Sequence, residues 1–208
     1  MERIGLFGGS FHPIHNGHLH LAHTAMEQLH LQHVIFVPAY CSPFKQKSAY
    51  TVSDAHRLAM CRLAVAGEPA FSVSDYELNR EQVSYTIDTI SHFQKQNPEA
   101  AFVLLMGSDM LLQFDHWYRY QEILQRVTLG VVSRDAADTE RIRQKQLELS
   151  QFGQIQIFCD AVLSVSSTKI REKLKKQEDC SCYLPRNVVQ YIQLHHLYQM
   201  GQKSTSCD

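Results

Sequence analysis

Residues 3–39 read RIGLFGGSFHPIHNGHLHLAHTAMEQLHLQHVIFVPA, and this stretch decides the fold class. Its apolar start, residues 3–9, ends in glycines and predicts a buried strand. Residues 17–31 carry apolar side chains at helical spacing, and residues 33–39 form a second short apolar run. A strand, a helix and a strand in close succession predict a βαβ unit, in which the two strands are parallel.

The rest of the chain repeats this alternation. We expect further strands at 70–78, 100–107, 127–134 and 154–161, and helices at 48–67, 84–98, 138–152, 166–176 and 185–196. The predicted fold class is α/β, a doubly wound, Rossmann-like parallel sheet with a small C-terminal helical part at 165–200. We expect a single domain over residues 1–200 and a frayed tail at 201–208. Ligands of such sheets bind beyond the carboxyl ends of the strands, which here carry Gly8, Gly9, Pro38, Gly107 and Arg134.

Composition and charge narrow the classes of function. The chain has 208 residues, of which 44% are hydrophobic and 20% charged, and its formal net charge is −1. A nearly neutral protein has no overall field that attracts a polyanion, so we expect no nucleic-acid partner. The composition still allows an anionic small molecule as the ligand, provided that groups in its binding site compensate its charge.

The cysteines and the apolar segments indicate the compartment. The six cysteines form no CxxC pair, which favours free thiols in a reducing cytosol. The first ten residues contain no long apolar segment of a secretory signal, and no run approaches the roughly 18 apolar residues that span a bilayer. We therefore expect a cytoplasmic protein without a membrane partner, and leave open whether it forms a homo-oligomer.

Residues 8–18, GGSFHPIHNGH, place glycines and histidines directly before the first predicted helix. Glycine has no Cβ, so Gly8 and Gly9 let another group approach the backbone after the first strand. The N–H groups at the helix start favour a phosphate. His15 and His18 are three residues apart, face the same point, and can donate hydrogen bonds to charge that develops there.

Zinc is the alternative ligand, because it accepts histidine nitrogens. The candidate ligands are His12, His15, His18, His20 and His23. The last two point away from His18 if the helix begins near residue 17, no cysteine or carboxylate lies close in sequence, and zinc gives the glycines no role. Phosphate is therefore favoured. The stretch lacks both G-x-x-x-x-G-K-[ST] and G-x-G-x-x-G, which disfavours a Walker-type NTPase and a dinucleotide dehydrogenase.

Two signatures resemble those of a known family. GGSFHPIHNGH is similar to the GG-[ST]-F-D-P-x-H-x-G-H signature of the nucleotidyltransferases with an H-x-G-H motif, and SSTKIR at 166–171 is similar to their S-[ST]-T-x-I-R signature. Three further segments, at 71–90, 107–117 and 184–198, resemble one branch, the bacterial nicotinate mononucleotide adenylyltransferases. The resemblance runs from Ile4 to about Tyr198.

The resemblance implies an enzyme that joins ATP to nicotinate mononucleotide, giving deamido-NAD and pyrophosphate in NAD biosynthesis. In this chemistry the 5′-phosphate attacks the α-phosphate of ATP in line, without an enzyme nucleophile. Catalysis then rests on positioning and on neutralising charge. Magnesium would arrive with ATP, bridging its phosphates, with no metal ligand from protein side chains.

The resemblance assigns catalytic roles to His18, His15 and Arg171, and the largest role to His18. The expected ATP-binding residues come from both signatures and from strand ends, and are Gly8, Gly9, Ser10, Phe11, His15, His18, Gly107, Asp109, Arg134, Ser166, Ser167, Thr168 and Arg171. The start of the 166–176 helix would supply donors to the β- and γ-phosphates, and its arginine a permanent positive charge. Taken alone, this segment is more typical of a capped, solvated basic helix, and the first signature reverses that preference.

The second substrate is a flat pyridine carboxylate on a ribose phosphate. The expected binding residues are Lys45, Ser84, Tyr85, Thr86, Asp109, Trp117 and Tyr118. Trp117 would stack on the ring, and backbone N–H groups at the start of the 84–98 helix and at Tyr118 would bind the carboxylate. A neutral amide gains less from these donors, so we expect the acid to be preferred. A core tryptophan and a helix-capping Asp109 are the structural alternatives.

Two positions depart from the family pattern. His12 stands where the pattern has Asp, so any role that needs a carboxylate there is in doubt, and Phe44 stands where the pattern has His. Four hypotheses stay open: the adenylyltransferase, a relative that uses nicotinamide mononucleotide or another phosphorylated acceptor, a non-catalytic nucleotide-binding protein, and a zinc-binding structural protein.

Overall fold

The computed structural model describes residues 1–43, 52–133, 139–159 and 165–199. The strands are β1 (Arg3–Gly9), β2 (His33–Pro38), β3 (Phe71–Val73), β4 (Ala101–Gly107), β5 (Thr128–Ser133) and β6 (Ile155–Cys159). The helices are α1 (Asn16–Leu29), α2 (Asp54–Val65), α3 (Tyr76–Asn79), α4 (Thr86–Gln96), α5 (Ser108–Leu111), α6 (Tyr120–Arg126), α7 (Thr139–Leu149), α8 (Ser167–Lys175) and α9 (Arg186–Leu194), with a short 3-10 helix, η2 (Phe114–His116).

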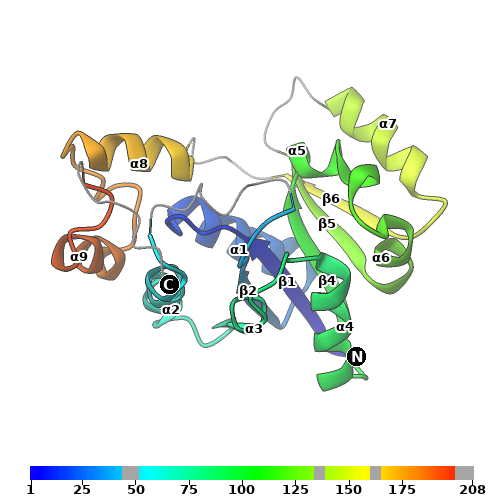
Figure 1. The fold of residues 1–208 in the computed structure, drawn as a ribbon. Helices are drawn as coiled ribbons and strands as arrows, with labels where there is room; N and C mark the ends of the chain where they lie inside the picture. The colour runs from blue at the N-terminus through cyan, green and yellow to red at the C-terminus, as the bar shows by residue number, and fades with distance from the viewer. Residues whose placement is uncertain (44–51, 134–138, 160–164, 200–208) are drawn as a thin grey trace.

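The strands form one sheet of six parallel strands in the order β3-β2-β1-β4-β5-β6. This is the order of a doubly wound sheet, in which the direction of winding reverses between β1 and β4. Figure 1 shows α8 and α9 together at one end of the molecule beside α2, and α5, α6 and α7 at the other end. The predicted α/β fold class is confirmed; the single domain over 1–200 stays a prediction.

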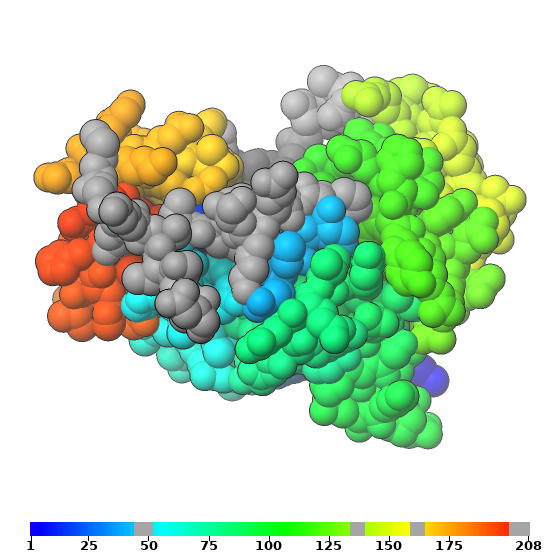
Figure 2. Space-filling view, in the orientation of Figure 1, coloured from blue at the N-terminus to red at the C-terminus, as the bar shows by residue number. Residues whose placement is uncertain are grey.

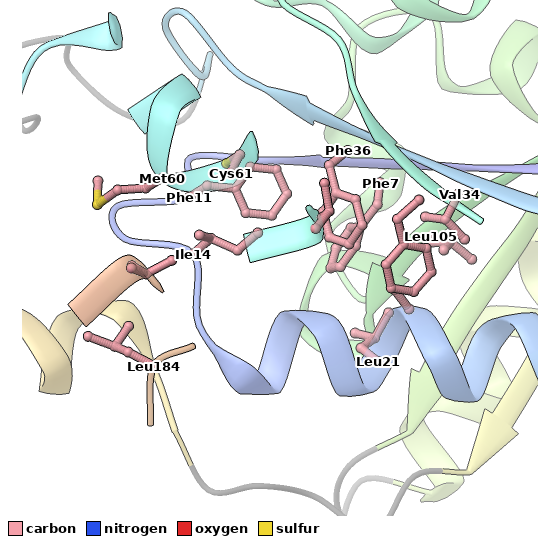
Figure 3. Close-up of a cluster of buried hydrophobic side chains, with 14 of the residues drawn as sticks. Phe7, Phe11, Ile14, Leu21, Val34, Phe36, Met60, Cys61, Leu105 and Leu184 are labelled. Carbon is pink, nitrogen blue, oxygen red and sulfur yellow. The ribbon is translucent and has the colours of Figure 1, made fainter. Parts of the chain in front are cut away.

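The side chains of β1 alternate between two hydrophobic cores, because β1 lies at the centre of the sheet. Ile4 and Leu6 belong to a cluster with α4, α5, α6 and α7. Phe7 belongs to a second cluster with α1, α2, α8 and α9, and Figure 3 shows its ring near Phe36, Val34 and Leu105. Helices therefore cover both faces of the sheet, as parallel sheets require.

The pairing of β1 opens a crevice at the carboxyl end of the sheet. β1 stays paired with β2 as far as Gly9 and Pro38. Its pairing with β4 ends earlier, at Leu6 and Leu104. The last residues of β1 and β4 therefore separate, and the space between them lies where ligands of doubly wound sheets bind.

Three expected elements differ in detail. The predicted strand at 70–78 is wrong in its second half: Ser74 Oγ accepts the Tyr76 N–H at 3.2 Å, and helix α3 follows with Asp75 as its N-cap. Helix α4 begins at Thr86 with Tyr85 as its N-cap, rather than at Ser84. Helix α2 begins after the N-cap Ser53, and the earlier part of the predicted 48–67 helix lies mostly outside the described residues.

No helix within the described parts of the chain is long and apolar enough to cross a membrane. Figure 2 shows the surface indented between the C-terminal helices, in orange and red, and the green half of the molecule.

Candidate active site

One cavity of about 700 Å³ lies at the carboxyl ends of β1 and β4. Both predicted substrate sites contribute to its lining. The sequence-predicted residues that line it are Gly8, Gly9, Ser10, His18, Ser84, Tyr85, Thr86, Gly107, Asp109, Trp117 and Tyr118. A cavity of this volume falls in the usual range for small-molecule sites.

The glycines after β1 have different roles. A Cβ on Gly8 would meet no atom within 4 Å, so the backbone there is open to a ligand. A Cβ on Gly9 would lie 3.0 Å from the Phe11 ring, which itself is buried beside Phe7, His18 and Phe36. Gly9 therefore makes room for Phe11, whose side chain belongs to the core and leaves only its backbone for a ligand.

His15 and His18 form a pair at the start of α1. Their rings stack with centroids 3.6 Å apart. The His15 backbone N–H donates to Nδ1 of His18 at 3.1 Å, which assigns the ring proton of His18 to Nε2. His18 lines the cavity, whereas His15 is buried and is the N-cap residue of α1. The geometry thus orients His18 as the hydrogen-bond donor.

Helix α8 contacts the loop between β1 and α1, at His12 and Pro13. Ser166 caps the helix by accepting the Lys169 N–H at 3.3 Å, as the structural alternative for this segment expected. Ser167 Oγ donates to the Pro13 carbonyl at 2.9 Å, and Arg171 Nη1 donates to the His12 carbonyl at 2.8 Å. Thr168 Oγ1 accepts from Nη2 of Arg171 at 3.2 Å.

These contacts bring the two family signatures together. The 166–171 side chains hold the first signature's backbone, and none of them is part of the cavity lining. Direct contact between them and a phosphate stays a prediction.

His12, which stands at the family's aspartate position, lies in the interior of the protein. Its ring is 5.2 Å from that of Tyr198, and both residues are buried. Burial also raises the pKa of the Tyr198 phenol. The chain after α9 therefore returns to the loop of the first signature and covers it.

The second half of the cavity is built from the start of α4 and the η2 segment. The Ser84 N–H donates to the Cys41 carbonyl at 2.9 Å, and Ser84 Oγ accepts the Tyr40 N–H at 3.0 Å. The Tyr85 and Tyr118 rings lie 4.8 Å apart, and Trp117 packs 5.0 Å from Phe114. The N-terminal end of α4 and the flat indole thus line one cavity wall together.

Gly107 and Asp109 mark the end of β4. A Cβ on Gly107 would come within 2.5 Å of the Asp109 carboxylate oxygen, so a side chain there would displace that carboxylate. Gly107 is the N-cap residue of α5, and Asp109 itself is exposed in the cavity lining. The capping alternative for Asp109 is therefore wrong, and its carboxylate is open to a ligand hydroxyl.

Two buried charged residues near the cavity were not predicted. Arg57 on α2 is 0% exposed and binds backbone carbonyls, and Glu77 on α3 is buried in the cavity wall. Thr89 Oγ1 donates to Glu77 at 2.5 Å. The sequence pattern predicts Glu77 in a strand and Arg57 on a helix, and it carries no signal that either charge is buried.

Burial raises the pKa of Glu77 above its ordinary value of 4.5, against the hydrogen bonds from Thr89 and Ser84. The unfolded chain loses this proton as pH rises through 4.5, while the folded chain still holds it. Rising pH therefore favours unfolding across that interval. We expect the melting temperature of Glu77→Gln, measured relative to wild type, to increase from acidic to neutral pH; a difference that does not vary with pH would contradict this.

Lys45, Arg134 and Phe44 lie outside the described residues.

Within the described ranges, no three His, Cys, Asp or Glu side chains gather as metal ligands. His23 faces away from the cavity, pairing with Glu68 at 3.5 Å and contacting the Phe71 ring. The zinc alternative therefore finds no support in the described part of the chain.

Comparison with known proteins gives the family. The cytidylyltransferase-like family profile matches residues 6–173. A Clostridium tetani protein named "Probable nicotinate-nucleotide adenylyltransferase" is 38% identical over 96% of this chain and 100% of its own length. A protein of the same name from Neisseria meningitidis serogroup C is also 38% identical, with the same coverage.

The fold has a solved counterpart. The Plasmodium falciparum nicotinic acid mononucleotide adenylyltransferase, complexed with NaAD, is similar with a TM-score of 0.76 and 20% identity, over 95% of this chain and 98% of that chain. At this identity the likeness shows the shared fold. The profile and the full-length relatives show more: this chain belongs to the cytidylyltransferase-like family, in its group of nicotinate-nucleotide adenylyltransferases.

Proposed function

We propose that this protein transfers AMP from ATP to nicotinate mononucleotide, giving deamido-NAD and pyrophosphate in NAD biosynthesis. The observation that carries the proposal is the single cavity that joins Gly8 and His18 to the start of α4 and Trp117. One end suits a polyphosphate, because it offers open backbone and an oriented imidazole donor. The other suits a flat anionic ring, because it offers an indole and a helix N-terminus. The names of the full-length relatives support the same reaction.

In the proposed reaction, a 5′-phosphate oxygen of the mononucleotide forms a bond to the α-phosphorus of ATP. The bond from that phosphorus to the bridging oxygen breaks, and pyrophosphate leaves with the electron pair. His18 donates its Nε2–H to a phosphate oxygen on which charge increases, which lowers the barrier electrostatically. Arg171 adds positive charge beside the β- and γ-phosphates.

A divalent cation fits this arrangement, and we propose magnesium. The carboxylates of the described cavity lining are Glu77 and Asp109, and Glu77 is buried against Thr89. Residues 8–18 contain no carboxylate. The phosphate oxygens of ATP would therefore hold the cation, which supplies charge neutralisation.

The test of the proposed function is pyrophosphate release with ATP, magnesium and each mononucleotide in turn. Hydrogen bonds to a charged group are stronger than those to a neutral one. We therefore expect kcat/KM to be roughly 10- to 100-fold higher for nicotinate mononucleotide than for nicotinamide mononucleotide. A clear preference for nicotinamide mononucleotide would favour the related amide enzyme. Binding of ATP without turnover on either acceptor would favour a non-catalytic nucleotide-binding protein.

Trp117 tests the acceptor side of the cavity. We expect Trp117→Ala to raise the KM for nicotinate mononucleotide by about 10-fold or more, because stacking on an aromatic ring contributes about 1–3 kcal/mol. The KM for ATP should stay within about twofold of wild type. Trp117→Phe keeps an aromatic face against Phe114 and serves as the matched control. Equal increases in both KM values would assign Trp117 to the core instead.

A further inference from the structure

Arg57 connects the two strand ends beside the cavity. Nη1 donates to the Ser10 carbonyl at 2.7 Å, and Nη2 donates to the Ala39 carbonyl at 2.7 Å. Nη2 also binds Asp54, one turn earlier on α2, at 2.7 Å. Ser10 follows β1 and Ala39 follows β2, so one guanidinium holds both strand ends. Figure 3 shows Met60 and Cys61, from the same helix, beside Phe11 and Ile14.

These bonds fix the direction of successive peptide groups. The Gly9 carbonyl accepts the Ala39 N–H at 2.9 Å, and the Ser10 carbonyl accepts from Arg57. In a planar trans peptide the N–H points opposite to the carbonyl. The N–H groups of Ser10 and Phe11 are therefore directed away from β2 and α2.

The backbone at this point adopts a costly conformation. Phe11 has a φ of 42°, in the left-handed region that favours glycine. Such a conformation persists only where the surroundings hold it. Arg57 holds the peptide directly before Phe11, and α8 holds the His12 and Pro13 carbonyls directly after it.

We propose that Arg57 is a positioning residue for adenylyl transfer: it orients the Ser10–Phe11 peptide so that the loop's N–H groups face the ATP phosphates. The proposal rests on the proposed function for the identity of the nucleotide. A lysine at this position keeps the charge but lacks the planar fork that binds two carbonyls and a carboxylate together. Arg57 itself touches no substrate.

The experiment compares Arg57→Lys, Asp54→Asn and wild type by steady-state kinetics and by calorimetric binding of a non-hydrolysable ATP analogue. Asp54 is 27% exposed, so its substitution removes a partner of Arg57 without emptying a buried volume. Small displacements of a positioning group cost up to about 100-fold, so we expect kcat/KM for ATP to fall about 10- to 100-fold in Arg57→Lys and less in Asp54→Asn. The KM for nicotinate mononucleotide should change at most about twofold, since the change is confined to the phosphate loop.

Arg62→Lys is the matched control, because Arg62 lies on the same helix, is 58% exposed and pairs with Asp75. If Arg57→Lys does not melt cooperatively, Asp54→Asn provides the comparison. A folded Arg57→Lys or Asp54→Asn protein that binds the analogue as wild type does, with only a lower melting temperature, would overturn the proposal. Analogue binding by a wild-type protein without turnover would instead contradict the proposed function alone.

Discussion

Replacing His18 with alanine is expected to lower kcat about 100- to 1,000-fold, the usual loss when one preorganised donor to a developing charge is removed. The Nδ1 atom accepts the His15 N–H, which leaves Nε2–H as the donor that the alanine variant lacks. The ring also packs against Phe7 and Phe11, so the melting temperature should fall as well. Pyrophosphate release under saturating substrates measures the effect on kcat.

His23→Ala is the matched control for His18→Ala. It removes the same side chain from the same helix, but at a site that is 47% exposed and paired with Glu68. Its turnover should equal that of wild type. Wild-type turnover in a folded His18→Ala protein would remove His18 from the catalytic residues.

Replacing Arg171 with alanine is expected to lower kcat/KM about 1,000-fold, the lower end of the range for arginines that neutralise phosphoryl charge. The substitution removes a permanent positive charge and also frees the His12 carbonyl, which Arg171 holds at 2.8 Å. Arg171→Lys separates the two effects, because it keeps the charge without the fork. We expect it to fall between wild type and Arg171→Ala.

Lys169→Ala provides the control for helix α8. Lys169 is exposed, carries the same charge and lies two residues before Arg171. If Lys169→Ala and Arg171→Ala lower kcat/KM equally, the effect comes from the general basic character of the helix. The prediction for Arg171 would then be wrong.

The sequence predicted the parts of the fold that follow from local periodicity. β1, α1 and β2 have strong apolar patterns and no competing local signals, and the structure places them as expected. The strand prediction failed for the segment after β3. Its apolar residues fit a strand, but the Ser74 hydroxyl accepts the Tyr76 N–H, and helix α3 begins at Tyr76. A local side-chain to backbone hydrogen bond of this kind competes with a strand's ladder, which a short hydrophobic pattern does not reveal.

The site could be predicted in outline because its residues lie in long signatures. His18, Trp117 and the start of α4 do line one cavity. Gly9 shows the limit: it lines the cavity as predicted, but the sequence did not indicate that its missing Cβ also makes room for the Phe11 ring. Arg57 was missed because a single arginine on an amphipathic helix is usually a surface residue, and its burial depends on strand ends distant in sequence.

The position of α8 and Tyr198 against the loop after β1 has a consequence for how the protein is made. A chain leaves the ribosome N-terminus first, so Ser167 and Arg171 emerge 154 and 159 residues after Pro13 and His12, whose carbonyls they hold. Tyr198, which covers His12, emerges later still. During synthesis the loop after β1 therefore lacks these contacts until α8 and Tyr198 have also emerged from the ribosome.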